Sequence, residues 1–278
     1  MTIVLTILSV VSLLMPASFH HTQENKVERA ECLRPFYEKL DRGKQPVRIL
    51  HLGDSHVRGH VFSVVARRQL EEAWGSAAVE PQEISYRTTA LATETGKAGL
   101  VYHAIGINGA RYAHFNTPAY LGKVKELQPD LIILSFGTNE AQGTYSEAAH
   151  REEMGALVEA LRKQCPTAQI LLTTPPGAYR TLRIRHRRNG KTYYTYQRQA
   201  NPNTPKVCAV LRSYAEEKGL PVWDLYTIVG GQQYGLRNWT SAGMMRKDRI
   251  HYTDAGYTLM GHLLAEALIK ARETNDKK

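Results

Sequence analysis

The sequence predicts a single α/β domain over residues 26–278, built on a doubly wound parallel sheet. Short apolar runs typical of strands buried on both faces alternate with amphipathic segments typical of helices. Neither an internal repeat nor a low-complexity linker interrupts this alternation. The 278 residues are 42% hydrophobic and 22% charged, so a domain of this size can bury a large core.

The first half of the domain contains three expected strands and their helices. A partly amphipathic helix is expected over 27–40, where Leu33, Phe36 and Leu40 lie near one face. Apolar runs predict strands at 47–53, 99–105 and 130–136. Helical spacing of valines predicts a helix after Ser55, and a helix over 120–128 is stopped by Pro129. The polar residues 81–98 are predicted to be irregular.

The second half continues the alternation. Apolar residues at i, i+3, i+4 and i+7 predict a helix over 147–163: Met154, Leu157, Val158 and Leu161. The next strand, at 169–174, is closed by two prolines. The remaining elements are a helix over 207–218, a strand at 220–225, a glycine-rich loop over 228–245 and a final helix that Thr253 can cap.

Residues 177–204 break the pattern, because they are rich in arginine and tyrosine and contain Asn189-Gly190. Asn-Gly between strand-prone residues predicts a β-hairpin, with strands at 183–188 and 191–196, inserted into the domain and projecting from it. The segment supplies seven of the ten excess positive charges of a chain whose formal net charge is +10. It is either a solvated surface feature or a surface for an anionic glycan, with Arg185, Arg187 and Tyr194 near the rim of the site.

Three predicted strands end in turns that carry polar groups. Ser55 follows the first strand, Gly109 the second and Asn139 the third. Because ligands bind at the carboxyl edge of such sheets, we expect all three residues at that edge. Ser55 could be a nucleophile there, or Asp54 or Ser55 could only cap the next helix.

Asp248 and His251 lie near the other end of the chain, in the sequence DRIH. A serine hydroxyl becomes a good nucleophile when an imidazole accepts its proton and a carboxylate fixes the tautomer of that imidazole. Ser55, His251 and Asp248 could therefore perform acyl transfer. The backbone N–H groups of Ser55 and Gly109 and the side-chain amide of Asn139 could stabilise the oxyanion.

Four sequence blocks resemble those of the SGNH, or GDSL-type, hydrolases: GDSH at 53–56, GINGA at 106–110, GTNE at 137–140 and DRIH at 248–251. Their order and spacing match too, over nearly the whole predicted domain. The resemblance implies a three-layer α/β/α flavodoxin-like fold without a cofactor. It also implies Ser55 as nucleophile, His251 as general base with Asp248 as its partner, and Gly109 and Asn139 as oxyanion-hole donors.

The blocks depart from the family pattern at two positions. His56 replaces the usual leucine of the first block, which resembles the branch of bacterial peptidoglycan and polysaccharide O-acetylesterases. His56 could contact substrate or serve local packing and hydrogen bonding. Glu140 stands where many relatives have Asp, which should affect the turn more than the chemistry. We expect structural roles for the other histidines in predicted elements: His51, His103 and His262.

The first 18 residues predict a secretory signal sequence. An apolar stretch from Ile3 to Met15 precedes small residues and a polar segment, although no Lys or Arg comes before it. An uncleaved membrane anchor is the alternative. We therefore expect an exported bacterial protein, periplasmic or secreted, without stable membrane insertion. Its three cysteines permit at most one disulfide and match no metal-binding pattern.

These observations predict an exported serine esterase that removes O-acetyl or other short acyl groups from a polysaccharide such as peptidoglycan. A lysophospholipase or thioesterase, and an O-acetyltransferase, are alternatives with the same chemistry. A non-catalytic glycan-binding module is the alternative of another class. We do not expect a nucleic-acid partner, because the excess charge is concentrated in one segment.

Overall fold

A computed structural model describes residues 16–58, 61–80 and 86–276. The signal sequence predicted over residues 1–18 falls almost entirely outside these ranges. Within them, no helix has both the length and the apolar character needed to cross a bilayer.

A seven-stranded sheet forms the centre of the protein, in the order β1-β9-β6-β5-β2-β4-β3. Its strands are β1 (Val27–Glu28), β2 (Pro46–Gly53), β3 (Thr89–Ala90), β4 (Gly99–Gly106), β5 (Leu131–Ser135), β6 (Gln169–Thr173) and β9 (Val222–Trp223). The five inner strands are parallel, and β1 and β3 pair antiparallel at the two edges. The predicted mainly parallel sheet is confirmed. The two edge strands have two residues each, which is too short to produce a periodic pattern.

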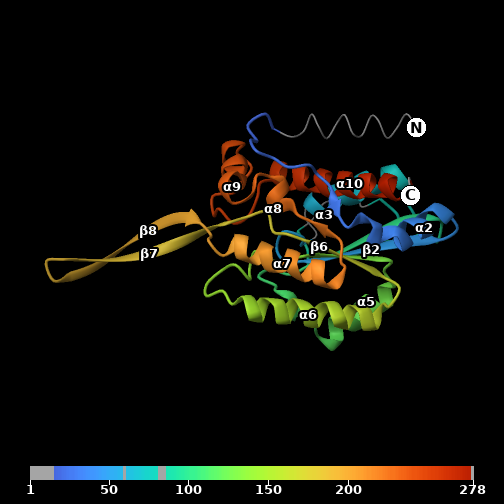
Figure 1. Cartoon of the computed structure of the whole chain (residues 1–278), viewed down its shortest axis with the longest axis horizontal. Coiled ribbons are helices and arrows are strands. Elements are labelled where there is room, and N and C mark those ends of the chain that lie inside the picture. Colours follow the sequence, from blue (N-terminus) through green and yellow to red (C-terminus); the bar gives the residue numbers. More distant parts are fainter. Residues whose placement is uncertain (1–15, 59–60, 81–85, 277–278) are drawn as a thin grey trace.

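Helices cover both faces of the sheet and complete a three-layer α/β/α arrangement (Figure 1). One face is covered by η1 (Ala30–Leu33), α2 (Arg34–Arg42), α3 (Val61–Trp74), α8 (Leu225–Ile228), α9 (Gly231–Ser241) and α10 (Asp254–Asp276). The other is covered by α4 (Tyr112–Phe115), α5 (Pro118–Leu127), α6 (Glu147–Gln164) and α7 (Thr204–Lys218). Successive residues of β2 enter different cores: Ile49 packs with the first set and Leu50 with the second.

One predicted loop and two predicted elements are wrong. Helix α9 lies inside the segment expected to be a glycine-rich loop, and its residues Gly235, Asn238 and Trp239 are buried at i, i+3 and i+4. Gly235 carries no apolar side chain, so the helical spacing of these buried positions does not appear as an apolar pattern in the sequence. The strand expected at 220–225 shrinks to β9, because Asp224 caps the short helix α8. The helix expected over 27–40 begins only after β1.

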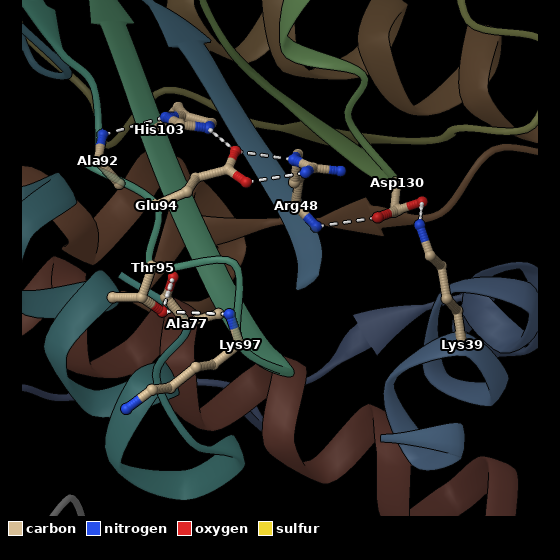
Figure 2. A network of polar contacts seen from close by, with 9 residues as sticks. All are labelled: Lys39, Arg48, Ala77, Ala92, Glu94, Thr95, Lys97, His103 and Asp130. Atoms are coloured by element: carbon tan, nitrogen blue, oxygen red, sulfur yellow. Dashed lines mark hydrogen bonds and ion pairs between the residues drawn. The ribbon is translucent and has the colours of Figure 1, made fainter. Parts of the chain in front are cut away.

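Near the amino ends of the parallel strands, charged side chains from separate segments of the chain form one network of hydrogen bonds and ion pairs (Figure 2). Asp130 accepts hydrogen bonds from Lys39 Nζ at 2.6 Å and from the backbone N–H of Arg48 at 2.9 Å. The guanidinium of Arg48 makes two hydrogen bonds of 2.8 Å to Glu94. Nε2 of His103 lies 3.6 Å from the same carboxylate. Each charge in the network therefore has a counter-charge inside the fold.

The predicted hairpin is present and is longer than expected. β7 (Tyr179–Arg188) and β8 (Lys191–Ala200) form a separate antiparallel pair that projects away from the three layers (Figure 1). Asn189 and Gly190 have φ values of 49° and 76°, the positive values that a tight hairpin turn requires.

Candidate active site

Ser55 lies in a turn that follows β2 directly. Oδ1 of Asp54 accepts a hydrogen bond of 2.9 Å from the backbone N–H of His56, which fixes the turn. The turn packs against the end of β4, where a Cβ at Gly106 would overlap the backbone of Arg58. Residues 55–58 form a turn, so Ser55 is not the residue directly before α3 and does not cap it.

The structure brings Ser55, His251 and Asp248 into one hydrogen-bonded chain. Oγ of Ser55 lies 2.9 Å from Nε2 of His251, and Nδ1 of His251 lies 2.8 Å from Oδ2 of Asp248. A proton on Nδ1 leaves Nε2 free to accept the serine proton. Partial burial raises the pKa of Asp248, but hydrogen bonds from the backbone of Ile250 and from His251 outweigh it, so the net pKa is lowered. Asp248 therefore stays charged, as a partner for an imidazolium must.

The loop that carries Asp248 and His251 is held in a defined conformation. Oδ1 of Asp248 accepts hydrogen bonds of 2.9 Å from the backbone N–H groups of Ile250 and His251. Arg249 between them has φ 62°, a left-handed value that non-glycine residues rarely adopt. The carbonyl of Arg249 accepts a hydrogen bond of 2.9 Å from the backbone of Tyr179, the first residue of the hairpin. A backbone hydrogen bond thus connects the base of the hairpin to the loop that carries Asp248 and His251.

Asn139 links the three turns that the sequence predicts to lie together. Its Nδ2 donates to the carbonyl of Ala110 at 3.0 Å and to Oδ2 of Asp54 at 3.3 Å. Gly109, next to Ala110, is exposed and has φ 72°, with open space where a side chain would lie. The carboxyl edge of the sheet therefore presents the Ser55, Gly109 and Asn139 turns side by side.

Two buried acids lie beneath these turns. Asp54 is 1% exposed, and burial, with a contribution from nearby Glu140, raises its pKa to about 8. Burial likewise raises the pKa of Glu140 to about 7. Glu140 accepts hydrogen bonds from the backbone N–H groups of Gly137 at 2.8 Å and Tyr112 at 3.3 Å. These hydrogen bonds hold the turn, which fits the expectation that glutamate at this position affects the turn more than the chemistry.

His56, a candidate substrate contact, is a buried residue instead. Its side chain is 5% exposed, and its Nδ1 lies 2.9 Å from the hydroxyl of Tyr257 on α10. Its ring centroid lies 5.5 Å from that of His251. Burial, followed by the proximity of His251, lowers the pKa of His56 to about 3, so the ring is neutral. The alternative interpretation, local packing and hydrogen bonding, fits this environment.

The other tentative substrate contacts do not surround Ser55. Arg185, Arg187 and Tyr194 lie along the projecting hairpin and are exposed. The hairpin base, rather than these residues, adjoins the Asp248 loop. The structural roles expected for His51, His103 and His262 fit their contacts. His51 lies between Tyr102 Oη and Ser135 Oγ, at 2.7 Å from each, and Nδ1 of His262 lies 2.6 Å from Oε1 of Gln69. Nδ1 of His103 accepts a hydrogen bond of 3.0 Å from the backbone N–H of Ala92.

Residues on both sides of Ser55 line a small cavity. Asp54, His56, Thr138, Pro175 and Met260 are among its walls, and its volume is about 20 Å³. Across the ranges that the structure describes, no group of three or more His, Cys, Asp or Glu side chains could hold a metal ion. The three cysteines are free thiols.

Two features of the site are not predicted from the sequence. Asp54 is predicted only as a turn or cap residue, whereas it contacts Asn139 from the third block. The contact of His56 with Tyr257, 201 residues away, is not predicted either. The position of Tyr257 at the start of a predicted core-facing helix was the available signal, but spacing within that helix cannot identify a partner on another element.

Comparison with known proteins agrees with this geometry. A model of the GDSL-like lipase/acylhydrolase family matches residues 52–259, which include Ser55, Gly109, Asn139, Asp248 and His251. A search of curated protein sequences gives no match.

Several solved structures share the fold. One described as a peptidoglycan O-acetylesterase is 19% identical, with a TM-score of 0.68 over 86% of this chain and 96% of its own. An acetyl esterase mutant with acetate ion is 13% identical, with a TM-score of 0.54 over 82% of this chain and 99% of its own. A carbohydrate esterase family 3 protein from Talaromyces cellulolyticus is 15% identical, with a TM-score of 0.53 over the same shares. With the family model spanning most of its length and the four blocks gathered at one edge of the sheet, the chain belongs to the GDSL-like lipase/acylhydrolase family.

Proposed function

We propose that the chain is an exported serine esterase that removes O-acetyl groups from a polysaccharide through an acyl-enzyme on Ser55. The observation that carries the proposal is the hydrogen-bonded chain from Ser55 Oγ through His251 to Asp248. Membership of the family supports hydrolase chemistry, and structures described as an acetyl esterase and a peptidoglycan O-acetylesterase share the fold.

In the first half of the reaction, Ser55 Oγ attacks the acetyl carbonyl while Nε2 of His251 accepts the hydroxyl proton. Asp248 holds the Nδ1 proton and stabilises the imidazolium. The oxyanion receives hydrogen bonds from the backbone N–H groups of Ser55 and Gly109 and from Nδ2 of Asn139, whose 3.3 Å bond to Asp54 is long enough to be exchanged.

In the second half, the proton on Nε2 of His251 passes to the departing sugar oxygen as its bond to the carbonyl carbon breaks. Acetyl-Ser55 remains. His251 then removes a proton from water, the resulting hydroxide attacks the carbonyl carbon of acetyl-Ser55, and the bond from that carbon to Oγ breaks. Acetate leaves, and the proton on Nε2 of His251 passes to Oγ of Ser55.

Hydrolysis of p-nitrophenyl acetate by Ser55→Ala tests the mechanism. We expect kcat/KM to fall by at least about 1,000-fold, because no other nucleophile is hydrogen-bonded to His251 in the described structure. Ser213→Ala, an exposed serine on α7, is the matched control and should keep full activity. Undiminished activity in Ser55→Ala contradicts the acyl-enzyme on this residue.

Substrate class is tested with a series of acyl chain lengths and with acetylated polymers. We expect acetate release, measured by mass spectrometry, from an O-acetylated polysaccharide and the highest kcat/KM for the acetyl ester. Preference for long chains identifies a lipase-type or thioesterase enzyme instead, and acetyl transfer to an added sugar identifies a transferase. Export is tested by amino-terminal sequencing of the mature protein, which should begin near Ser18.

A further inference from the structure

The hairpin has two chemically different faces. In an antiparallel pair, directly opposed residues share a face, and successive residues alternate between faces. We call one of them the arginine face; its side chains are all exposed and are Thr181, Arg183, Arg185, Arg187, Thr192, Tyr194, Tyr196 and Arg198. The opposite face carries Leu182, Ile184 and His186, which are half-buried. The strand register therefore places four of the seven basic residues of this segment on the same face as two tyrosines.

Side chains of the arginine face contact one another, and the hairpin segment contains no acidic residue to neutralise them. The guanidinium carbon of Arg183 lies 3.5 Å from the ring centroid of Tyr194, and Arg185 lies directly opposite Tyr194 in the register. Arg183, Arg185 and Arg187 follow one another at intervals of roughly 7 Å. No acidic residue occurs between Gly177 and Thr204. In the charged network at the amino edge, by contrast, Lys39 is paired with Asp130 and Arg48 with Glu94.

The hairpin is attached beside the candidate active site. It leaves the domain after β6, at the carboxyl edge of the sheet. The backbone N–H of Tyr179 donates to the carbonyl of Arg249 at 2.9 Å, and the hydroxyl of Tyr252 donates to the carbonyl of Gly177 at 2.7 Å. Arg249 and Tyr252 flank His251 within the same loop. A long molecule lying along the hairpin can therefore continue to the edge that presents Ser55.

We propose that the arginine face binds a polysaccharide that carries carboxylates along its length and holds an acetylated unit of the same polymer at Ser55. The inference rests on the proposed esterase function for the reaction at Ser55, whereas binding by the hairpin does not depend on it. Guanidinium groups pair with carboxylates in a bidentate manner, and the exposed rings of Tyr194 and Tyr196 offer apolar faces to the C–H faces of sugars.

The shape and charge of the hairpin favour a polymer over a second copy of the chain. Strands of ten residues extend over roughly 34 Å, so several units of a linear polymer can bind at once. Two copies of the arginine face would repel each other. A polysaccharide is favoured over a nucleic acid because only the former carries the acetyl ester on which the adjoining site is proposed to act.

The binding test compares two triple variants that remove the same charge. Arg183→Gln/Arg185→Gln/Arg187→Gln alters the arginine face, and Arg180→Gln/Arg188→Gln/Lys191→Gln alters the opposite one. With polygalacturonate as an ester-free probe and neutral dextran as the control, we expect about tenfold weaker binding for the first variant and less than about twofold for the second. Equal weakening in both variants indicates non-specific attraction and overturns the proposal.

The catalytic test uses chemically acetylated polygalacturonate. We expect the arginine-face variant to show a KM raised about tenfold with kcat unchanged, and unaltered kcat/KM on p-nitrophenyl acetate, which also shows that the domain is folded. Tyr194→Leu should raise the same KM less, about threefold. Unchanged KM on the polymer, or tighter binding to duplex DNA than to polygalacturonate at equal salt, overturns the inference. Loss of the proposed function is recognised separately, because wild-type protein would then bind the polymer but release no acetate.

Discussion

The two ends of the parallel strands carry similar polar residues in different states. At the amino end, Arg48, Glu94 and Asp130 are bonded to one another or to the backbone, and the acids are matched by bases. At the carboxyl end, Ser55 and His251 form a chain that reaches a partly exposed surface. Networks with every group paired stabilise a fold, whereas a serine hydroxyl bonded to a histidine with its own carboxylate is arranged for proton transfer. The contrast separates a structural edge from a reactive one.

The acids of the two ends also differ in the direction of their pKa shifts. At the amino end, hydrogen bonding to Arg48 lowers the pKa of Glu94. At the carboxyl end, burial raises the pKa of Asp54 and of Glu140, which have no basic side chain bonded to their carboxylates in the described structure. Paired charges therefore favour ionisation at one edge, and desolvation opposes it at the other.

The largest expected effect is on activity at the carboxyl edge. His251→Ala should lower kcat/KM for p-nitrophenyl acetate by at least about 1,000-fold, because no base then accepts the Ser55 proton. Thermal stability should change little, since the side chain is partly exposed. His186→Ala, on the face of the hairpin opposite the arginine face, is the control and should retain activity. Comparable losses in both variants would remove the distinction between a reactive edge and the rest of the surface.

A smaller effect is expected on stability at the amino edge. Asp130→Ala leaves the backbone N–H of Arg48 and the ammonium of Lys39 without their acceptor, which should cost about 2 kcal/mol of unfolding free energy. Lys39→Met removes only the ion pair and should cost less than about 1 kcal/mol. Urea unfolding measures both changes, and kcat/KM should stay the same. A large loss of activity without a loss of stability would show that this edge is not simply structural.

A third effect is expected on the pH dependence of stability. Because the folded pKa of Asp54, about 8, lies above its unfolded value, the folded state binds the extra proton. This stabilisation is complete below the unfolded pKa and is lost as pH rises through the folded one. Glu94, with its lowered pKa, acts in the opposite direction: its contribution is present above the unfolded pKa and lost as pH falls through the folded one.

Asp54→Asn tests the sign of this dependence. It should make the slope of unfolding free energy against pH less negative between pH 5 and 8 by up to about 1.4 kcal/mol per unit, the value for one proton. Urea unfolding at several pH values gives the slope. Glu94→Gln is the matched variant at the amino edge, and its loss of stabilisation should be greatest at neutral pH. An unchanged slope in Asp54→Asn would show that this carboxyl group does not take up a proton on folding.

Local patterns in the sequence predict most of the inner sheet and the principal helices. Continuous apolar runs identify β2, β4, β5 and β6, because both faces of a strand in the middle of this sheet are buried and carry mostly apolar side chains. The hairpin is recognised from Asn189-Gly190, whose backbone conformation is nearly specific to such turns. Helix α9 is missed because two of its three buried positions are Gly235 and Asn238, which do not contribute to an apolar periodicity.

The candidate site shows the same division between local and long-range information. The residue types of Ser55, Asp248 and His251, and the position of Ser55 after a predicted strand, indicate which groups could react. The structure brings the three side chains together. The burial of His56 is not readable, because the turn sequence is compatible with either an exposed or a buried ring. Its environment depends on Tyr257, which lies near the other end of the chain and contacts the ring in the folded protein.

Local sequence patterns predict the α/β alternation, the turns at strand ends, the hairpin and the residues able to form a nucleophile, base and acid. These features depend on backbone preferences and on hydrophobic patterns over a few residues. The folded chain is needed to show that Ser55 contacts His251 across 196 positions, that Asp54 lies against Asn139, and which hairpin residues share a face. Contacts of this kind are set by strand order, register and packing, so they exist only once distant segments are placed side by side.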